Sequence, residues 1–199
     1  MKGKTLLLTL LLTMLFVSVT SVRTYKAVAS TVPVSSFSVL PSTISWEPDG
    51  HKINDTFTID VVASDCVQLW SWSVGIAWNP SVLEYVSFGW GDFLTLSGGG
   101  QPMPGLINST SGETRAAWAQ TSTDNPVDAP SVKLINFTFR AVGFGTSNIT
   151  IMGPKFTKVV DPSFVTYVPP QFALNHGSFS FTAPPPPSPI SAMSVVPST

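Results

Sequence analysis

Charged side chains are scarce in this sequence of 199 residues. Only 11% of the residues are Asp, Glu, Lys or Arg, and the 10 basic and 11 acidic ones leave a formal net charge of -1. A protein that binds nucleic acid is expected to present a basic face to the phosphates. The nearly balanced charge therefore argues against a nucleic-acid partner.

Cysteine and histidine are almost absent. The single cysteine, Cys66, excludes an intramolecular disulfide, and beside a strand end it is expected to be a small buried hydrophobe rather than a nucleophile. His51 and His176 fall in separate predicted turns, and His51 has no ligand-type residue at a metal-binding spacing. No pair of carboxylates falls on a recognisable motif. The sequence therefore predicts no catalytic residues, no metal site and no cofactor, and the protein is not expected to be an enzyme.

Turn-forming residues and alternating apolar residues dominate instead. The chain holds 18 Pro and 14 Gly, which suits an all-β protein with many turns. Within the stretch from Thr56 to Leu94, every second residue of one run is large and apolar, which predicts a half-buried antiparallel strand. The apolar residues of this run are Trp70, Trp72, Val74, Ile76 and Trp78. The residues between them, which should face outward, are small: Ser71, Ser73, Gly75 and Ala77.

Similar alternation recurs along the chain. Further strands are predicted around residues 36–39, 44–46, 57–61, 83–87, 112–120, 133–142, 149–151 and 179–181. In the strand at 112–120 an inward Arg115 would be costly, so Trp118 should face the core. The glycine-rich segment 97–105 is predicted to be a flexible loop. The pattern predicts a single antiparallel β-sandwich, jelly-roll-like, of about nine strands.

The first 29 residues have the features of an export signal. Lys2 and Lys4 precede an apolar core at 6–19, and Ala27-Val28-Ala29 matches a cleavage site. The mature chain would then begin at Ser30 and be secreted or held at the cell surface. An uncleaved membrane anchor is the alternative, although the apolar run is short for a span of ~20 residues.

The composition of the last residues, 183–199, predicts a proline-rich, disordered linker. Pro184–Pro187 and Pro189 form a stiff, extended spacer. The residues after it, 190–199, are small and polar enough to be disordered.

The part between these ends resembles a cohesin domain. The similarity is carried by the segments NDTFTIDV (54–61), LWSWSVGIAWNPSVLE (69–84) and GDFL (91–94), in the order and spacing of the family's strands. It continues through the strand at 133–142, the turn at 143–147 and the closing strand at 175–181. The resemblance covers about residues 34–182, so residues 31–182 are assigned to one cohesin-like β-sandwich.

The resemblance implies a non-catalytic module that holds a dockerin, with the calcium bound by the dockerin rather than by this chain. The small residues Ser71, Ser73, Gly75 and Ala77 would suit the partner-binding face. Trp90, between two glycines, could stack on a sugar ring, anchor a protein partner, or cover the edge of the sandwich. Two other functions stay open: a carbohydrate-binding module for polysaccharide, and a structural spacer of an envelope protein.

Four asparagines lie in glycosylation sequons. They are Asn54, Asn108, Asn136 and Asn148. Each is a candidate glycan site in an exported chain, although a chain rich in Ser, Thr and Asn also produces such triplets by chance.

We expect the protein purified from its own host to begin at Ser30, because the Ala27-Val28-Ala29 motif follows the apolar core. N-terminal sequencing of the exported protein measures this directly. Recovery of a chain that retains Met1 in the membrane fraction would instead identify residues 6–19 as an anchor.

Overall fold

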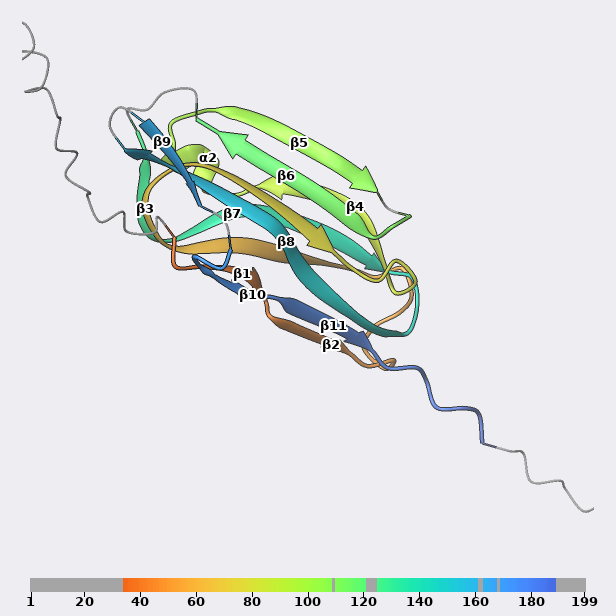
Figure 1. The fold of residues 1–199 in the computed structure, drawn as a ribbon. Helices are drawn as coiled ribbons and strands as arrows, with labels where there is room; N and C mark the ends of the chain where they lie inside the picture. Colours follow the sequence, from red (N-terminus) through yellow and green to blue (C-terminus); the bar gives the residue numbers. More distant parts are fainter. Residues whose placement is uncertain (1–33, 109, 121–124, 161–162, 168, 189–199) are drawn as a thin grey trace, which may run out of the picture. The chain divides into compact units, whose positions relative to one another are not determined.

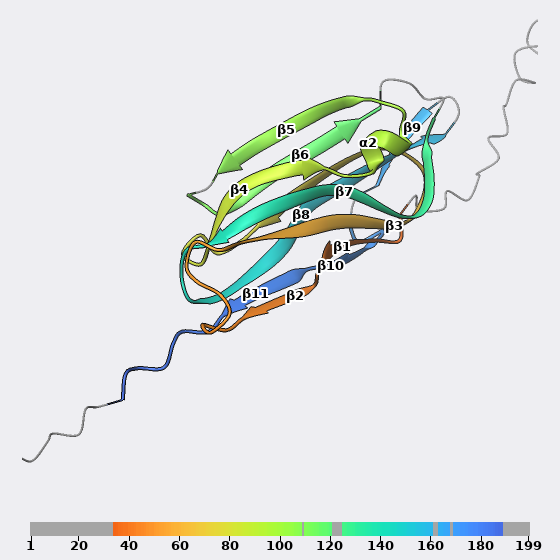
Figure 2. The same cartoon turned by 180° about the vertical axis from the view of Figure 1, so that it is seen from behind.

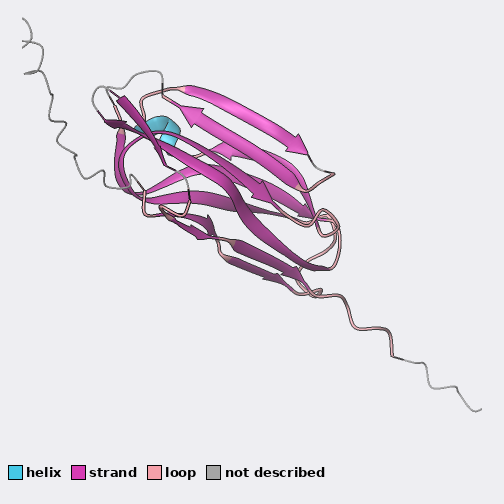
Figure 3. Ribbon diagram, in the orientation of Figure 1, coloured by secondary structure: helices cyan, strands magenta, loops and turns pink. Residues whose placement is uncertain are grey.

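The computed structural model describes residues 34–108, 110–120, 125–160, 163–167 and 169–188. These residues form eleven strands and one helix of four residues, α2 (Phe93–Leu96). Figure 3 shows how strands dominate the fold. The predicted all-β sandwich is confirmed. No helix in this part of the chain is long and apolar enough to cross a membrane.

The strands follow one another along most of the described chain. They are β1 (Ser36–Leu40), β2 (Thr43–Trp46), β3 (Thr56–Ala77), β4 (Leu83–Trp90), β5 (Gln101–Asn108), β6 (Glu113–Ala119), β7 (Val127–Ala141), β8 (Gly145–Val160), β9 (Ser163–Tyr167), β10 (Ala173–Asn175) and β11 (Gly177–Phe181).

Strand β3 belongs to both layers of the sandwich. Its 22 residues form one strand, but Asp65 and Gln68 both have a φ of 53°, which is uncommon for residues with a side chain and redirects the backbone. Before this bend β3 lies between β1 and β7, and after it β3 lies between β6 and β8. The two predicted strands of this region are therefore a single bent strand.

Two layers result from this path, seen from opposite sides in Figures 1 and 2. The first layer contains β10, β1, the start of β3, β7 and β4. The second contains β5, β6, the end of β3, and β8, with β9 and β11 pairing with different parts of β8 and β2 lying beyond β11.

Aromatic side chains from both layers fill the space between them. Phe37 of β1 stacks on Phe156 of β8 with 4.0 Å between ring centroids, and Trp78, just after β3, meets Phe139 of β7 edge-on at 5.1 Å. None of these four side chains is more than 5% exposed. Because buried aromatic rings contribute large apolar areas, such contacts hold the layers together.

Some details of the predicted strand set are wrong. Residues 101–108, largely within the predicted flexible loop, form β5 beside β6. The sequence pattern does not indicate the short strands β9 and β10. The sandwich is not purely antiparallel either, since β1 pairs with β10 and β2 with β11 in parallel.

Trp70 does not face the core, contrary to the sequence-based expectation. Leu69 and Ser71 pair with consecutive residues of β8, so Trp70 is an extra residue in the ladder, a β-bulge. The bulge gives the inward position to Leu69, which is 0% exposed. Trp70 is half-buried and contacts the exposed Phe164 of β9, with 4.6 Å between ring centroids. The rest of the predicted apolar row is buried as expected: Trp72, Val74, Ile76 and Trp78.

The thiol of Cys66 is enclosed at the bend of β3. The residue is 3% exposed, which confirms the expected buried hydrophobe. Burial first, and then the negative charges of Asp65 and Asp128, raise the pKa of this thiol to about 12. Because the thiolate is the reactive form, this cysteine is held in its inert state.

We expect Trp72→Ala to lower the free energy of unfolding by about 3–5 kcal/mol, because it empties a large volume in the core. Trp70→Ala, in the same strand but outside the core, should cost about 1 kcal/mol or less. Denaturant titration of the two variants measures both values. Equal losses would contradict the position of the bulge.

Cys66 should react slowly with a maleimide at pH 8 in the folded protein and rapidly in denaturant. Its raised pKa also makes the unfolded state lose its proton first, so this group's contribution to stability should fall as pH rises from 9.0 towards about 12. Cys66→Val removes the titrating group and should flatten this part of the pH profile. Fast labelling of the folded protein would show that the bend opens.

Candidate functional site

The four small residues predicted to face a partner lie in the middle of the second layer. We call Ser71, Ser73, Gly75 and Ala77 the outer strip. Ser71, Ser73 and Ala77 are half-buried, while Gly75 is buried. Opposite them, β6 contributes Ala119, Ala117, Arg115 and Glu113, and β8 contributes Thr157, Lys155, Met152 and Thr150. The centre of this face is therefore made mostly of small side chains.

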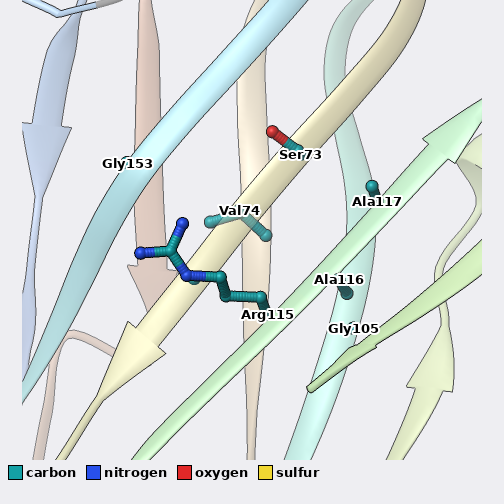
Figure 4. A pocket seen from close by; sticks show the side chains of 8 residues that line it. Ser73, Val74, Gly105, Arg115, Ala116, Ala117 and Gly153 are labelled. Carbon is teal, nitrogen blue, oxygen red and sulfur yellow. The ribbon is translucent and has the colours of Figure 1, made fainter. Parts of the chain in front are cut away.

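The side chain of Arg115 covers part of the outer strip, which the sequence pattern does not predict. It pairs with Gly75, and its side chain reaches from β6 across β3 toward Gly153 of β8 (Figure 4). A Cβ added at Gly75 would lie 3.2 Å from Arg115 Cγ and 3.2 Å from two backbone carbonyl oxygens. Glycine at this position thus leaves room for the arginine to lie across the strand.

Two open hollows follow the outer strip. One, of about 240 Å³, is lined by Ser73, Gly75, Arg115 and Gly153 among others. The other, of about 350 Å³, is lined by Ser71, Ser73 and Lys155 among others. Both lie on the surface of the sheet, so this face suits an elongated segment of a partner better than a small ligand that must be enclosed.

The outward face of the first layer is different because its charges are paired. Lys133 of β7 forms an ion pair with Asp60 of β3 at 3.7 Å, and Arg140 of β7 pairs with Glu84 of β4 at 3.2 Å. In contrast, Arg115 and Lys155 form no ion pair with any residue that the structure describes. Two exposed cations without an ion-pair partner among the described residues, Arg115 and Lys155, therefore lie beside the outer strip, a feature that residue spacing alone does not reveal.

Trp90 is half-buried at the end of β4 and packs against other aromatic rings. It meets Trp118 edge-on at 5.3 Å, Phe88 at 5.2 Å and Trp72 at 6.2 Å between centroids. A sugar platform needs an open ring face. Its three aromatic neighbours leave Trp90 only partly exposed at the edge of the sandwich. Trp118 itself is 3% exposed, as predicted.

The sequon asparagines lie in different environments. Asn54 and Asn148 are exposed. Asn136 is half-buried on the outward side of β7, where its amide lies against Gly89 of β4. Asn108 ends β5, and its side chain lies outside the described residues. Asn54 and Asn148 are thus the sterically open candidates for a glycan.

Both histidines have structural contacts. The ring of His51 stacks on Trp46 at 4.1 Å, and His176 Nδ1 accepts a hydrogen bond from the backbone N–H of Ile151 at 3.0 Å. Within the described part of the chain, no three His, Cys, Asp or Glu side chains come together in a way that could hold a metal ion. Neither the histidines nor Cys66 belong to the outer strip.

No family model matches this sequence, and no curated protein does either. Solved cohesin structures, however, align with most of the chain. A non-cellulosomal cohesin from the archaeon Archaeoglobus fulgidus is 12% identical, with a TM-score of 0.52 over 75% of this chain and 93% of that one. A type II cohesin domain from the cellulosome of Acetivibrio cellulolyticus is 11% identical, with a TM-score of 0.57 over 74% of this chain and 95% of that one.

A type I cohesin–dockerin complex from Clostridium thermocellum, Coh-OlpA with Doc918, extends this set. Its matching chain is 10% identical, with a TM-score of 0.54 over 74% of the present chain and 100% of its own. Identities this low establish the fold alone. The chain therefore has the fold of a cohesin domain, as the sequence resemblance implies.

Proposed function

We propose that this protein is an exported, non-catalytic module that binds a dockerin-type partner through the outer strip and the residues beside it on β6 and β8. The cohesin fold supports this proposal, and structures of that fold include complexes with dockerins. The observation that carries it is the row of small residues in the middle of a sheet whose other face is packed into the core.

A sheet face with small side chains lets a helix approach closely. The backbone beneath the outer strip is fixed on both sides by β6 and β8, so little ordering entropy is lost when a partner docks. A stable interface of standard size covers ~800 Å² on each partner. On the other layer, a partner would have to desolvate two existing ion pairs.

The calcium in such a complex would be bound by the dockerin. Export and a place at the cell surface or in an extracellular complex remain part of the proposal, and they rest on the signal-like residues 1–29.

A carbohydrate-binding role and a structural spacer are the competing functions. The first depends on Trp90 offering a ring face to a sugar. Trp90 meets Phe88 and Trp118 edge-on. The neighbouring Trp72 and Trp118 are buried, so neither offers a second ring beside Trp90 for stacking on a sugar. The protein-binding function is therefore favoured.

Ser73→Arg should abolish pull-down of a calcium-loaded dockerin from the same organism, because it adds a long charged side chain at the centre of the outer strip. Thr58→Arg is the matched control: it places the same residue on β3, but on the exposed side of the first layer. The control should bind like the unmodified protein. Gly75→Arg is a poorer test, since even a Cβ there is crowded at 3.2 Å.

Circular dichroism should show an intact fold for both variants, and removal of calcium by a chelator should release the dockerin. If the unmodified protein ignores every dockerin but is retarded on cellulose, xylan or chitin, and Trp90→Ala removes that retardation, the carbohydrate-binding function is correct instead. If the protein binds neither a dockerin nor a polysaccharide, the structural spacer is the function that remains.

A further inference from the structure

An aromatic pair lies at one end of the outer strip. Phe164 of β9 is 52% exposed, and its ring lies 4.6 Å from that of Trp70. Thr166 of β9 lines the same hollow as Ser71, and side chains two residues apart in a strand share a face. Phe164 and Trp70 therefore border the outer strip on its own side of the sheet.

This aromatic pair is not needed for the core. Leu69 occupies the inward position that the pattern assigns to Trp70, and Trp70 is not among the hydrophobic residues that pack against the core cluster. Exposed large aromatic side chains on an otherwise small-residue face are characteristic of binding hot spots, where Trp is enriched. The bulge thus places a tryptophan where a partner can reach it.

Two cations lie further along the same face. Lys155 pairs with Ser73, and Arg115 with Gly75, so they occupy successive positions along the outer strip. Both are exposed. Glu113 is also on this face, opposite Ala77, but no ion pair joins it to Arg115 among the described residues. A partner that docks here must provide anionic groups, or leave two cations desolvated and unpaired.

The geometry points to a docking helix with one apolar side chain and two acidic residues one turn apart, and we propose this as the chemistry of the partner. The proposal rests on the protein-binding function above. The apolar side chain packs on Trp70 and Phe164. The acidic residues pair with Lys155 and Arg115.

The spacing of the cations sets the spacing of the acids. Lys155 pairs with Ser73 and Arg115 pairs with Gly75. These two positions are two residues apart on β3, or about 6–7 Å along a strand, and the Arg115 side chain extends from there toward Gly153 (Figure 4). One turn of an α-helix rises ~5.4 Å. A helix lying along β3 and β8 therefore presents carboxylates at positions i and i+4 to the two cations and its preceding turns to the aromatic pair.

The first test uses the full chain and calcium-loaded dockerin modules of the same organism, with affinity measured by titration calorimetry. For a dockerin that binds, Arg115→Glu and Lys155→Glu should each raise Kd about tenfold or more, because like charges then face each other. Lys52→Glu, which makes the same charge change at an exposed turn residue away from this face, should leave Kd unchanged. Raising NaCl from ~0.1 to ~1 M should weaken dockerin binding by the unmodified protein more than binding by the variant that carries both substitutions.

The second test addresses the aromatic pair. Phe164→Ala and Trp70→Ala should each raise Kd by roughly 30-fold, as expected for a hot-spot residue. Phe144→Ala is the control, since Phe144 is 44% exposed but packs on Phe181 at the β7–β8 turn. It should bind normally.

The outcomes separate this inference from the proposed function. If a dockerin binds, but neither the two charge reversals nor the aromatic truncations weaken it beyond their controls, the inference is wrong and the proposed function stands. If no dockerin binds the unmodified protein, both are wrong. The Lys155→Glu variant can also be combined with a dockerin in which one acidic residue is changed to Lys. If this combination recovers the lost affinity, that acidic residue is the one that pairs with Lys155.

Discussion

The bend and bulge in β3 are the constraint on which the rest of this structure depends. The bend at Asp65–Gln68 moves one continuous strand from the first layer to the second. The bulge at Trp70 then resets the alternation, so that Trp72 and every second residue after it point inward. Without the bulge, one face of the strand would exchange with the other. The core and the outer strip therefore follow from the same local irregularity.

The two outward faces have different electrostatic properties. In the first layer, each of the cations Lys133 and Arg140 has a carboxylate partner, which satisfies the charge within the molecule. In the second layer, Arg115 and Lys155 have none among the described residues. Exposed ion pairs add little to stability, so the difference matters mainly for association, where unpaired charges select a partner of opposite sign.

Much of the fold could be predicted because period-two alternation is local. The strand at 133–142 is an example: Ile135, Phe137 and Phe139 are all buried, as the pattern indicates. The bulge at Trp70 could not be predicted in this way, because it depends on how β3 pairs with β8, a strand that lies more than eighty residues later in the chain. Strand β5 could not be predicted from the pattern, because it contains two prolines and a glycine, residues that usually mark loops. The sequence predicted the small residues of the outer strip, but it gave no sign that Arg115 crosses Gly75.

The central claim is that the outward face of the second layer binds the partner. The most direct measurement is a map of backbone amide chemical shifts in the labelled protein, before and after addition of a calcium-loaded dockerin. The account predicts changes concentrated in the residues of β3 from Ser71 to Ala77, in β6 near Arg115 and in β8 near Lys155. Changes confined to β4 and β7, or to the surroundings of Trp90, would contradict it.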